Sequence, residues 1–344
     1  MSASPPLLPQ RFTDWFAARG WAARPHQLDM LAKARDGRSA LLIAPTGGGK
    51  TLAGFLPSLV DLAAGGRAPD AGVHTLYISP LKALAVDVER NLMIPVREMK
   101  LDVTVESRSG DTGQARKQRQ RSSPPDILLT TPEQLALFCA WDGARTYFTD
   151  LKCVIVDEAH AIWPSKRGDL LALGLARLAS FAPGLRRVGL SATVDDPDLV
   201  RRWMGGDIDL VQGAPGARPH VEVLVSEGKV PWAGHTAEHA MAEIYEIIKG
   251  CRTTLVFVNT RFQAEFAFQK LWELNDDNLA IALHHGSLSA EQRRKVEAAM
   301  GRGEIRAVVC TSTLDMGIDW GDVDLVIQLA APKGSSRMVQ RIGR

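Results

Sequence analysis

The sequence contains few cysteines, and no two of them have the spacing of a metal or redox pair. Only Cys139, Cys153, Cys251 and Cys310 occur among the 344 residues, without a CxxC pair. The last three stand in or beside apolar, strand-like runs. We therefore expect reduced core thiols, and neither disulfides nor zinc ligands.

The sequence also lacks a long hydrophobic run and an excess of one charge. No window approaches the roughly 20 apolar residues that a membrane span needs, so we expect no membrane partner. The first ten residues show neither a basic segment nor a continuous apolar stretch, which predicts a cytoplasmic protein without a secretion or transit signal. Because 41 basic residues are balanced by 39 acidic ones, any nucleic-acid contact must be local.

What the sequence does have is a globular composition and enough length for two domains. With 45% hydrophobic and 23% charged residues, 344 residues suit two cores, each with its own sheet. Short runs rich in β-branched residues alternate with helical patterns, which predicts an α/β fold with mainly parallel sheets flanked by helices. The runs are 40–44, 75–79, 126–130, 153–156 and 188–190, then 255–258, 280–283, 307–310 and 325–327. Near the end, Ser289 and Gln292 form an S-x-x-Q capping box that opens a helix, which Gly301 closes.

The alternation breaks between the two halves of the chain. Residues 213–235 contain GAPGARP and GKVPWAGH, whose prolines interrupt any helix, so we interpret this stretch as a linker. A short strand is expected inside it at 221–225. The first domain is then 1–212 and the second 236–344.

The segment APTGGGKT lies between a strand-like run and a helix. Its glycines let successive backbone N–H groups turn toward a phosphate, and the helix N terminus adds its dipole. In this pattern Lys50 reaches the β- and γ-phosphates, and Thr51 offers its hydroxyl to Mg²⁺. Ala44 replaces the first glycine of the general G-x-x-x-x-G-K-[ST] pattern, whereas the variant A-x-T-G-x-G-K-T is matched fully. The predicted ATP-binding loop consists of Thr46, Gly47, Gly48, Gly49, Lys50 and Thr51.

A pair of acidic residues follows the fourth strand-like run, in VIVDEAH. Two carboxylates at the end of a strand buried on both faces are difficult to explain by packing. We predict that Asp157 holds Mg²⁺ through water and that Glu158 orients and deprotonates the attacking water. With Lys50, they form the catalytic set of the first domain. A metabolite kinase could share the glycine loop, but not this acidic pair together with the motifs that follow.

With SAT at 191–193 and QRIGR at 340–344, the ordered motifs resemble the superfamily 2 DEAD/DEAH-box helicases over nearly the whole chain. The resemblance implies two tandem RecA-like domains of the P-loop NTPase type, with ATP and Mg²⁺ as cofactors. Within the superfamily, DEAHAIWPSKRGDLLALGLARL and GIDWGDVDLVIQLAAPKGSSRMVQRIGR resemble Lhr-like (large helicase-related) proteins. The bacterial ligase-associated DEXH-box DNA helicases are the subgroup that these runs resemble in particular.

The resemblance also assigns roles to individual residues. RPHQ resembles the adenine-reading Q motif, which adds Gln27 to the cofactor site. In the second domain, Gln340 and Arg344 would be catalytic. Gly317, Asp319 and Arg341 would bind the nucleotide. The implied nucleic-acid contacts are Pro80, Lys82, Arg108, Gly110, Thr131 and Pro132 in the first domain, and Asn259, Thr260, Arg261, His285, Gly286, Thr311 and Thr313 in the second.

The activity implied by the resemblance is ATP-driven 3′-to-5′ movement on single-stranded or tailed duplex DNA, in DNA repair. Repair proteins such as a ligase or a nuclease would be partners. An RNA helicase stays an alternative, because contacts to phosphates leave the sugar unspecified. A non-enzymatic nucleic-acid scaffold is the other alternative, and the intact Lys50, Asp157 and Glu158 argue against it. Because the chain stops at Arg344, inside the last motif, we expect a fragment that binds ATP but hydrolyses it weakly alone.

Some groups have both a functional and a structural interpretation. The basic stretch 114–121, QARKQRQR, could bind phosphates, but we favour a solvated helix face. One of Trp15, Phe16 and Trp21 could stack on adenine, but we favour the core for them. His160 could couple the nucleotide site to SAT or cap a strand, and here we favour the coupling.

Overall fold

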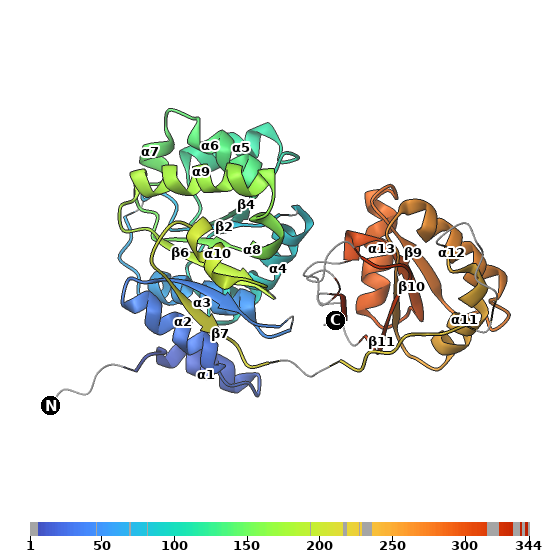
Figure 1. Cartoon of the computed structure of the whole chain (residues 1–344). Coiled ribbons are helices and arrows are strands. Elements are labelled where there is room, and N and C mark those ends of the chain that lie inside the picture. The colour runs from blue at the N-terminus through green and yellow to red at the C-terminus, as the bar shows by residue number, and fades with distance from the viewer. Residues whose placement is uncertain are drawn as a thin grey trace. The chain divides into compact units, whose positions relative to one another are not determined.

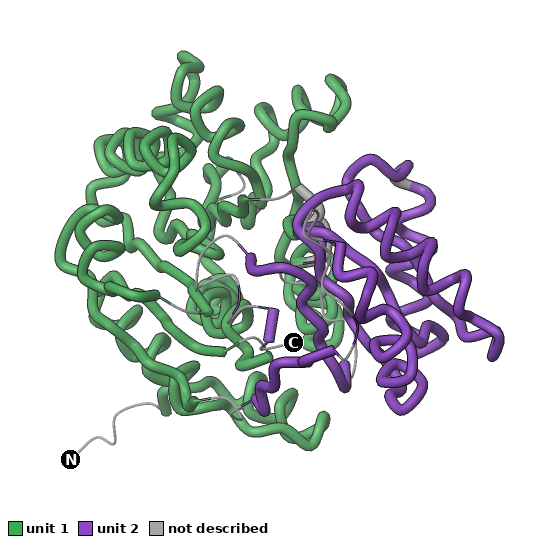
Figure 2. Tube along the Cα trace, turned by 45° about the vertical axis from the view of Figure 1, so that its right-hand side comes forward, with its two compact units in different colours: residues 1–216 green, residues 217–344 purple. Residues whose placement is uncertain are grey.

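The computed structural model describes residues 6–45, 47–68, 70–80, 82–192, 194–215, 219–226, 228, 236–314, 323–332, 338, 341 and 342. The chain divides into two compact units, 1–216 and 217–344, and each unit has its own sheet with flanking helices (Figure 1, Figure 2). The predicted α/β class is therefore confirmed. The linker at 213–235 stays a prediction, because much of it lies outside the described residues.

The first unit contains a seven-stranded parallel sheet in the order β3-β4-β2-β5-β6-β1-β7. Its strands are β1 (Ser39–Ile43), β2 (Thr75–Ile78), β3 (Val105–Ser107), β4 (Ile127–Thr130), β5 (Cys153–Val156), β6 (Arg186–Ser191) and β7 (Ile208–Gln212). The five predicted strands are all present. The two that the sequence did not predict, β3 and β7, are the edge strands, which are buried less completely than the strands between them.

Helices cover both faces of this sheet, and each face has its own hydrophobic cluster. Adjacent strand residues alternate between the clusters: Leu76 packs on one face and Tyr77 on the other. One face is covered by α1 (Gln10–Ala18), α2 (Pro25–Arg35), α3 (Lys50–Ala63) and α4 (Lys82–Glu98). The other side of the unit carries α6 (Pro132–Cys139), α7 (Ala144–Tyr147), α8 (Ala159–Ile162), α9 (Lys166–Phe181) and α10 (Pro197–Trp203). Helix α5 (Gln114–Ser122) follows β3.

The aromatic residues in and after helix α1 were expected in the core. Trp15 and Phe16 are 9% and 4% exposed and belong to the core, as expected. Trp21 lies beyond the helix and is 53% exposed, so the core interpretation was wrong for it. Its ring is instead covered in part by the guanidinium of Arg19, 5.0 Å from the ring centroid.

Helix α3 carries Lys50 and Thr51, and a glycine lets it approach the sheet closely. A Cβ atom added at Gly54 would lie 3.0 Å from Leu190 of β6 and 3.4 Å from Ile155 of β5. With a larger residue there, these side chains or the helix would have to shift by a few tenths of an ångström. The glycine therefore helps to fix the height of the helix N terminus above the sheet.

The second unit contains a four-stranded parallel sheet in the order β11-β8-β10-β9. Its elements are η1 (Glu238–Ala240), α11 (Met241–Lys249), β8 (Thr254–Phe257), α12 (Arg261–Glu273), β9 (Ile281–His284), α13 (Ala290–Gly301), β10 (Ala307–Cys310), η2 (Ser312–Leu314) and β11 (Leu325–Gln328). The capping box of Ser289 and Gln292 is confirmed at the start of α13. A second box, of Thr260 and Gln263, starts α12 and was not predicted.

The strand expected at 221–225 is absent. Residues 219–226 are described and contain no strand, and Val223 and Val225 are each 85% exposed. A run of alternating valines becomes a strand only beside a neighbour that accepts its hydrogen bonds, and none pairs with it here. At the end of this segment, Ser226 donates a hydrogen bond to Glu243 of α11 at 2.9 Å, which ties the segment to the second unit.

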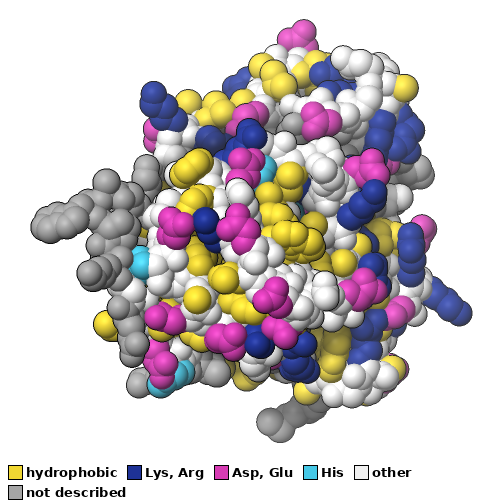
Figure 3. Space-filling view, turned by 90° about the vertical axis from the view of Figure 1, so that its right-hand side faces the viewer, with side chains coloured by type: hydrophobic (Ala, Val, Ile, Leu, Met, Phe, Trp, Pro, Cys, Tyr) yellow, Lys and Arg dark blue, Asp and Glu magenta, His cyan; other side chains and the backbone are white. Residues whose placement is uncertain are grey.

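The structure also bears on membrane spans, the cysteines and the distribution of charge. Among the described residues, no helix combines the length and the apolar character that a membrane crossing requires. The four cysteines are free thiols, and Cys153 and Cys310 are buried. Basic and acidic side chains both occur among hydrophobic ones on the face drawn in Figure 3, in keeping with the net charge of +2.

Candidate functional site

Three loops of the first unit bring the predicted phosphate motifs to one edge of the sheet. The glycine loop follows β1, the acidic pair follows β5, and SAT begins at the end of β6. These strands are parallel neighbours in the order β5-β6-β1. Carboxyl ends of neighbouring parallel strands converge, and ligands of such sheets bind there. The order of the strands therefore assembles motifs that lie more than 100 residues apart in the sequence.

The glycine loop adopts a conformation that needs glycine. Gly47 and Gly49 have φ angles of 71° and 74°, in the left-handed region. At Gly48, a Cβ atom would lie 2.7 Å from the carbonyl oxygen of Pro45. The Nζ atom of Lys50 lies 3.1 Å from the same oxygen, so the loop folds back around its own lysine. Thr46 lies outside the described residues.

Three consecutive glycine carbonyls of the loop are contacted from the start of α2. The Nη1 atom of Arg24 donates to Gly47 at 3.2 Å, and Nε2 of His26 lies 2.9 Å from the oxygen of Gly48. The amide of Gln27 is 3.4 Å from the oxygen of Gly49 and also caps its own helix through Arg24 N–H. Burial lowers the pKa of His26, so its neutral ring donates through Nε2. Sequence reasoning missed Arg24 and His26, and adenine reading by Gln27 stays a prediction.

The acidic pair is buried, and Asp157 is held by two donors. Its Oδ2 accepts from the hydroxyl of Tyr77 at 2.5 Å, and its Oδ1 accepts from the backbone N–H of Glu158 at 2.8 Å. Burial, and then the charge of Glu158, raise the pKa of Asp157 to about 6, while the two hydrogen bonds and the Lys50 ammonium lower it. Lys50 is thus near enough to Asp157 to favour its charged form. Tyr77 was not predicted, although a tyrosine in an aliphatic strand is a signal.

The DEAH and SAT motifs are in direct contact through His160. Its Nδ1 atom lies 2.8 Å from the hydroxyl of Ser191 and 3.5 Å from Oε2 of Glu158. Glu158 itself has a left-handed backbone, with φ of 48°, at the point where β5 turns into α8. The contact that the favoured interpretation of His160 requires is present, and the coupling of the nucleotide site to SAT stays a prediction. Thr193 lies outside the described residues.

The donor set fits Mg²⁺ that is held mainly by phosphates and water. In the described part of the chain, no cluster of three or more His, Cys, Asp or Glu side chains could hold a metal by itself. Mg²⁺ typically takes one or two carboxylates and completes its shell with water and substrate phosphates. The buried Asp157 and the second residue of α3, Thr51, offer oxygen ligands of that kind.

The predicted nucleic-acid contacts of the first unit follow the other strands at the same edge. Pro80 follows β2, Thr131 and Pro132 follow β4, and Arg108 and Gly110 follow β3. Because these strands are neighbours in the order β3-β4-β2, next to β5, the nucleotide and nucleic-acid candidates occupy adjoining parts of one edge. Helix α4 begins at Lys82.

Arg108 differs from the other candidates because its guanidinium turns inward. It is 6% exposed, lies 4.3 Å over the ring of Phe138, and donates to the carbonyl of Lys117 at 3.0 Å. Burial lowers its pKa, and the charge of Arg121 lowers it further. A nucleic-acid contact by Arg108 stays a prediction, and it would require the side chain to leave this position.

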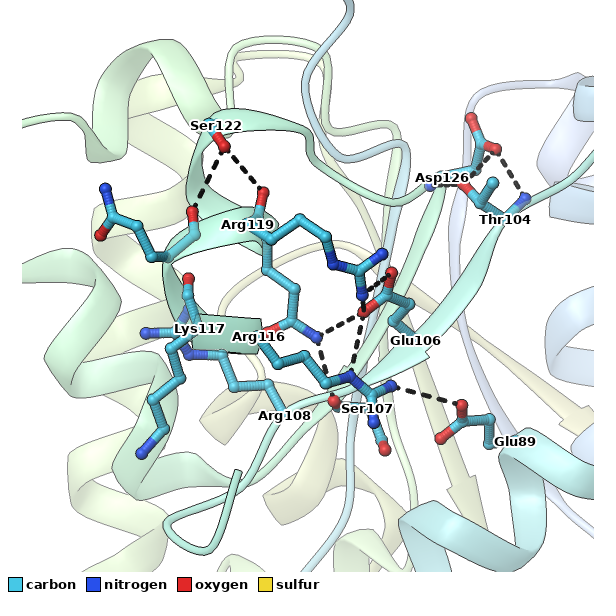
Figure 4. A network of polar contacts seen from close by, with 12 residues as sticks. Glu89, Thr104, Glu106, Ser107, Arg108, Arg116, Lys117, Arg119, Ser122 and Asp126 are labelled. Carbon is cyan, nitrogen blue, oxygen red and sulfur yellow. Dashed lines mark hydrogen bonds and ion pairs between the residues drawn. The ribbon is translucent and has the colours of Figure 1, made fainter. Parts of the chain in front are cut away.

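The basic helix α5 is held on β3 by one carboxylate. Glu106 accepts from Arg116 Nε at 3.2 Å, from Arg119 at 2.7 Å and from the amide of Gln120 at 2.8 Å (Figure 4). The arginine partners are 42% and 60% exposed. Two of the four cations of the stretch 114–121 are thus paired at the surface, in agreement with the favoured interpretation as a solvated helix face.

In the second unit, the candidates also gather at the carboxyl edge of the sheet. They follow β8 (Asn259, Thr260 and Arg261), β9 (His285 and Gly286) and β10 (Thr311 and Thr313). Thr260 caps α12, and Arg261 donates to Glu265 at 2.8 Å. The same carboxylate lies 3.4 Å from Nε2 of His285, so it links two of the three loops.

The remaining candidates belong to the last two motifs. Gly317, Asp319, Gln340 and Arg344 lie outside the described residues. Arg341 is 1% exposed, donates to Oε1 of Gln328 at 2.7 Å, and lies 4.5 Å over the ring of Phe257. Its side chain therefore packs on β8 and β11, and its predicted contact with the nucleotide stays a prediction.

Comparison with known protein families identifies the family of this chain. Residues 24–200 match the family model of the DEAD/DEAH box helicases, and residues 239–344 match that of the helicase conserved C-terminal domain. The chain belongs to the DEAD/DEAH box helicases. It thus belongs to a family of ATP-dependent enzymes with two RecA-like domains, as the motifs predicted.

Within this helicase family the relatives are of the Lhr type. The chain is 37% identical to the Lhr helicase/probable uracil glycosylase of Mycolicibacterium smegmatis, over 96% of the chain and 25% of that protein. It is 35% identical to the ATP-dependent helicase Lhr-Core of Methanocaldococcus jannaschii, over 98% of the chain and 42% of that protein. The Mycobacterium smegmatis Lhr structure with single-stranded DNA and AMP-PNP matches with a TM-score of 0.86 and 37% identity, over 98% of this chain and 46% of that one.

These matches confirm the Lhr-like resemblance. The helicase chain spans less than half the length of each of these relatives. The narrower ligase-associated subgroup stays a prediction.

Proposed function

We propose that this chain is the ATPase motor core of a DNA helicase that moves 3′-to-5′ along single-stranded DNA. The observation that carries the proposal is the convergence of the glycine loop, the acidic pair and SAT at one sheet edge, with His160 bonded to Ser191. A packing role does not account for two buried carboxylates beside a lysine-bearing glycine loop. A nucleotide motor needs that combination.

In the proposed mechanism, the residues of the first unit hold the triphosphate and prepare the water. The amides of the glycine loop and the Lys50 ammonium bind the β- and γ-phosphates, and Thr51 and Asp157 hold Mg²⁺. When bound, Mg²⁺ neutralises charge that develops on the phosphates. Glu158 orients and deprotonates the attacking water, and Gln340 and Arg344 act on the γ-phosphate.

Coupling to the nucleic acid starts at His160 in this proposal. It contacts Ser191 directly and lies within 3.5 Å of Glu158, so a change at the γ-phosphate alters the hydrogen bonds of SAT. The nucleic-acid candidates follow the neighbouring strands of the same sheet edge. A rigid parallel sheet connects the two groups, which lets the nucleotide state bias the grip on the strand.

DNA is proposed as the substrate because the similar Lhr structure was determined with single-stranded DNA and AMP-PNP bound. A role in DNA repair, with a ligase or nuclease as partner, extends this proposal. The cytoplasm remains the expected location. Contacts to phosphates leave the sugar unspecified, so the RNA alternative needs its own test.

Strand displacement on tailed duplexes, with a longer protein that contains this chain, tests substrate and direction together. The proposal predicts that ATP drives displacement from duplexes with a 3′ single-stranded tail, and that matched 5′-tailed duplexes stay intact. Repeating the 3′-tailed assay with an RNA loading strand gives the sugar preference. Displacement from the 5′ tail, or a faster reaction on RNA, would contradict the proposed direction or substrate.

A further inference from the structure

A chain of hydrogen bonds in the second unit joins α13, β9 and η2, the segment after β10. Oε1 of Glu297, on α13, lies 3.1 Å from Nε2 of His284, the last residue of β9. On the other side of the imidazole, Nδ1 lies 2.8 Å from the hydroxyl of Thr313. The motifs predict a nucleic-acid contact for Thr313 and assign no role to His284 or Glu297.

The carboxylate of Glu297 determines where the imidazole carries its hydrogen. A carboxylate only accepts hydrogen bonds, so Nε2 of His284 must donate to it. The ring is 2% exposed, and burial is the main reason why its pKa lies below the ordinary histidine range. At neutral pH the ring is therefore uncharged, its Nδ1 is an acceptor, and the Thr313 hydroxyl donates to Nδ1.

This assignment leaves Thr313 with nothing to donate to a phosphate. A threonine hydroxyl has one hydrogen, and the only other acceptor that the structure gives it is the His284 carbonyl, at 3.2 Å. A phosphodiester offers only acceptors. Donation to it would leave the buried Nδ1 without a partner, which is costly, unless the imidazole takes up a proton at that nitrogen.

We propose that His284 is a positioning residue: a proton at its Nδ1, supported by Glu297, turns the Thr313 hydroxyl into a donor for a backbone phosphate. The proton comes from the solvent. The new N–H donates to Oγ1 of Thr313, and the threonine hydrogen points to the phosphate oxygen. The inference rests on the proposed function, because it needs a bound strand.

The charges around His284 make this step depend on the strand. Glu297 favours the imidazolium, whereas Arg293, also on α13, and the adjacent His285 oppose it. His285 in turn lies 3.4 Å from Glu265 of α12. An arriving phosphate adds a negative charge on the Thr313 side and offsets Arg293. Binding of the strand and uptake of the proton should therefore favour each other.

The tautomer can be tested without any ligand. Nitrogen-15 NMR of the protein at pH 7.5 distinguishes a protonated from an unprotonated ring nitrogen, and His284→Gln identifies the signals. The inference predicts a neutral ring with hydrogen on Nε2 and a lone pair on Nδ1. A neutral ring with hydrogen on Nδ1 would overturn it.

Proton uptake on binding tests the role itself. Calorimetric titration with a single-stranded oligodeoxynucleotide, in two buffers of different ionisation enthalpy at the same pH, counts the protons taken up. The wild-type protein should take up part of a proton near pH 7 and bind more tightly as the pH falls. Thr313→Val should lose that uptake and about 10-fold or more in affinity at the lower pH, because a hydrogen bond to a charged group is lost.

Two further variants provide the controls. Thr313→Ser keeps the hydroxyl and should restore the uptake. Ser312→Ala removes a neighbouring exposed hydroxyl that has no described bond to His284, so it should leave the uptake unchanged. Undiminished uptake in Thr313→Val, or none in the wild type, would overturn this inference alone. A protein that binds no strand at all would overturn the proposed function as well.

Discussion

Replacing Tyr77 by phenylalanine removes a single hydroxyl from the buried acidic site. The ring of Tyr77 stacks on Phe55, with 5.2 Å between the centroids, and that packing is unchanged in Tyr77→Phe. The hydroxyl donates to Oδ2 of Asp157, which then keeps only the backbone N–H of Glu158 as a described donor. Any effect on Mg²⁺·ATP is therefore transmitted through Asp157.

The size of the effect follows from burial and charge. A hydrogen bond to a charged group contributes about 1.5–3 kcal/mol, and 1.36 kcal/mol corresponds to one pKa unit. The pKa of Asp157, which burial and Glu158 already raise to about 6, should then rise by about one to two units in the variant. A carboxyl group that is partly protonated at neutral pH holds Mg²⁺ less well.

The assay is the affinity for Mg²⁺·ATP as a function of pH. The carboxylate form is needed, so binding of both proteins should weaken as the pH falls. The curve for Tyr77→Phe should lie about one to two pH units higher than the wild-type curve and meet it at alkaline pH. Tyr147→Phe is the matched control, because the hydroxyl of this buried tyrosine has no hydrogen-bond partner among the described atoms. Superimposable curves for Tyr77→Phe and the wild type would refute the reasoning.

Three more predictions concern other parts of the first unit. Ser191→Ala should slow hydrolysis while ATP binding persists. The loss in the Ser191→Ala/His160→Ala double variant should be smaller than the sum of the two single losses, because the two side chains share one hydrogen bond; additive losses in this double-mutant cycle would count against the link. Gly54→Ala should lower the unfolding free energy by about 1–3 kcal/mol in denaturant titrations, because its Cβ meets β6 at 3.0 Å, whereas Gly113→Ala, with open space, should be nearly neutral. Burial lowers the pKa of His74 to about 4, below its value in the unfolded chain, so the unfolded chain binds the extra proton as the pH falls. The unfolding free energy should therefore fall by about 3 kcal/mol between about pH 6.5 and 4. An equally steep dependence of the unfolding free energy on pH in His74→Asn would contradict this.

The sheets could be predicted because their central strands are buried on both faces. Residues 153–156 are apolar throughout, and the structure places β5 over the same residues. Edge strands lack that signal: β3 has three residues, and β7 has only two buried positions among its five. The valines at 221–225 show the opposite error, since alternation is compatible with a strand but does not supply the partner that a strand needs.

The parts of the candidate site that could be predicted are those in which a short run of adjacent residues forms a recognisable motif. The glycine loop, the acidic pair and their order along the chain were enough to predict a phosphate site. The contacts of Arg24 and His26 with the loop, and of Tyr77 with Asp157, join segments that are distant in the sequence. A tyrosine in an aliphatic strand is a local signal, but no local pattern identifies the partner of any of these three residues. The inward turn of Arg108 depends on Phe138, which comes from α6, so the burial of Arg108 could not be predicted either.

The central claim is that the glycine loop and Lys50 hold a triphosphate beside the acidic pair. Equilibrium binding of Mg²⁺·ATP, with hydrolysis followed in the same samples, tests it most directly. We predict weaker binding by Lys50→Ala, unchanged binding by Lys117→Ala on the basic helix, and wild-type binding without turnover by Glu158→Gln. Equal ATP affinity in the wild type and Lys50→Ala, or continued turnover in Glu158→Gln, would contradict it.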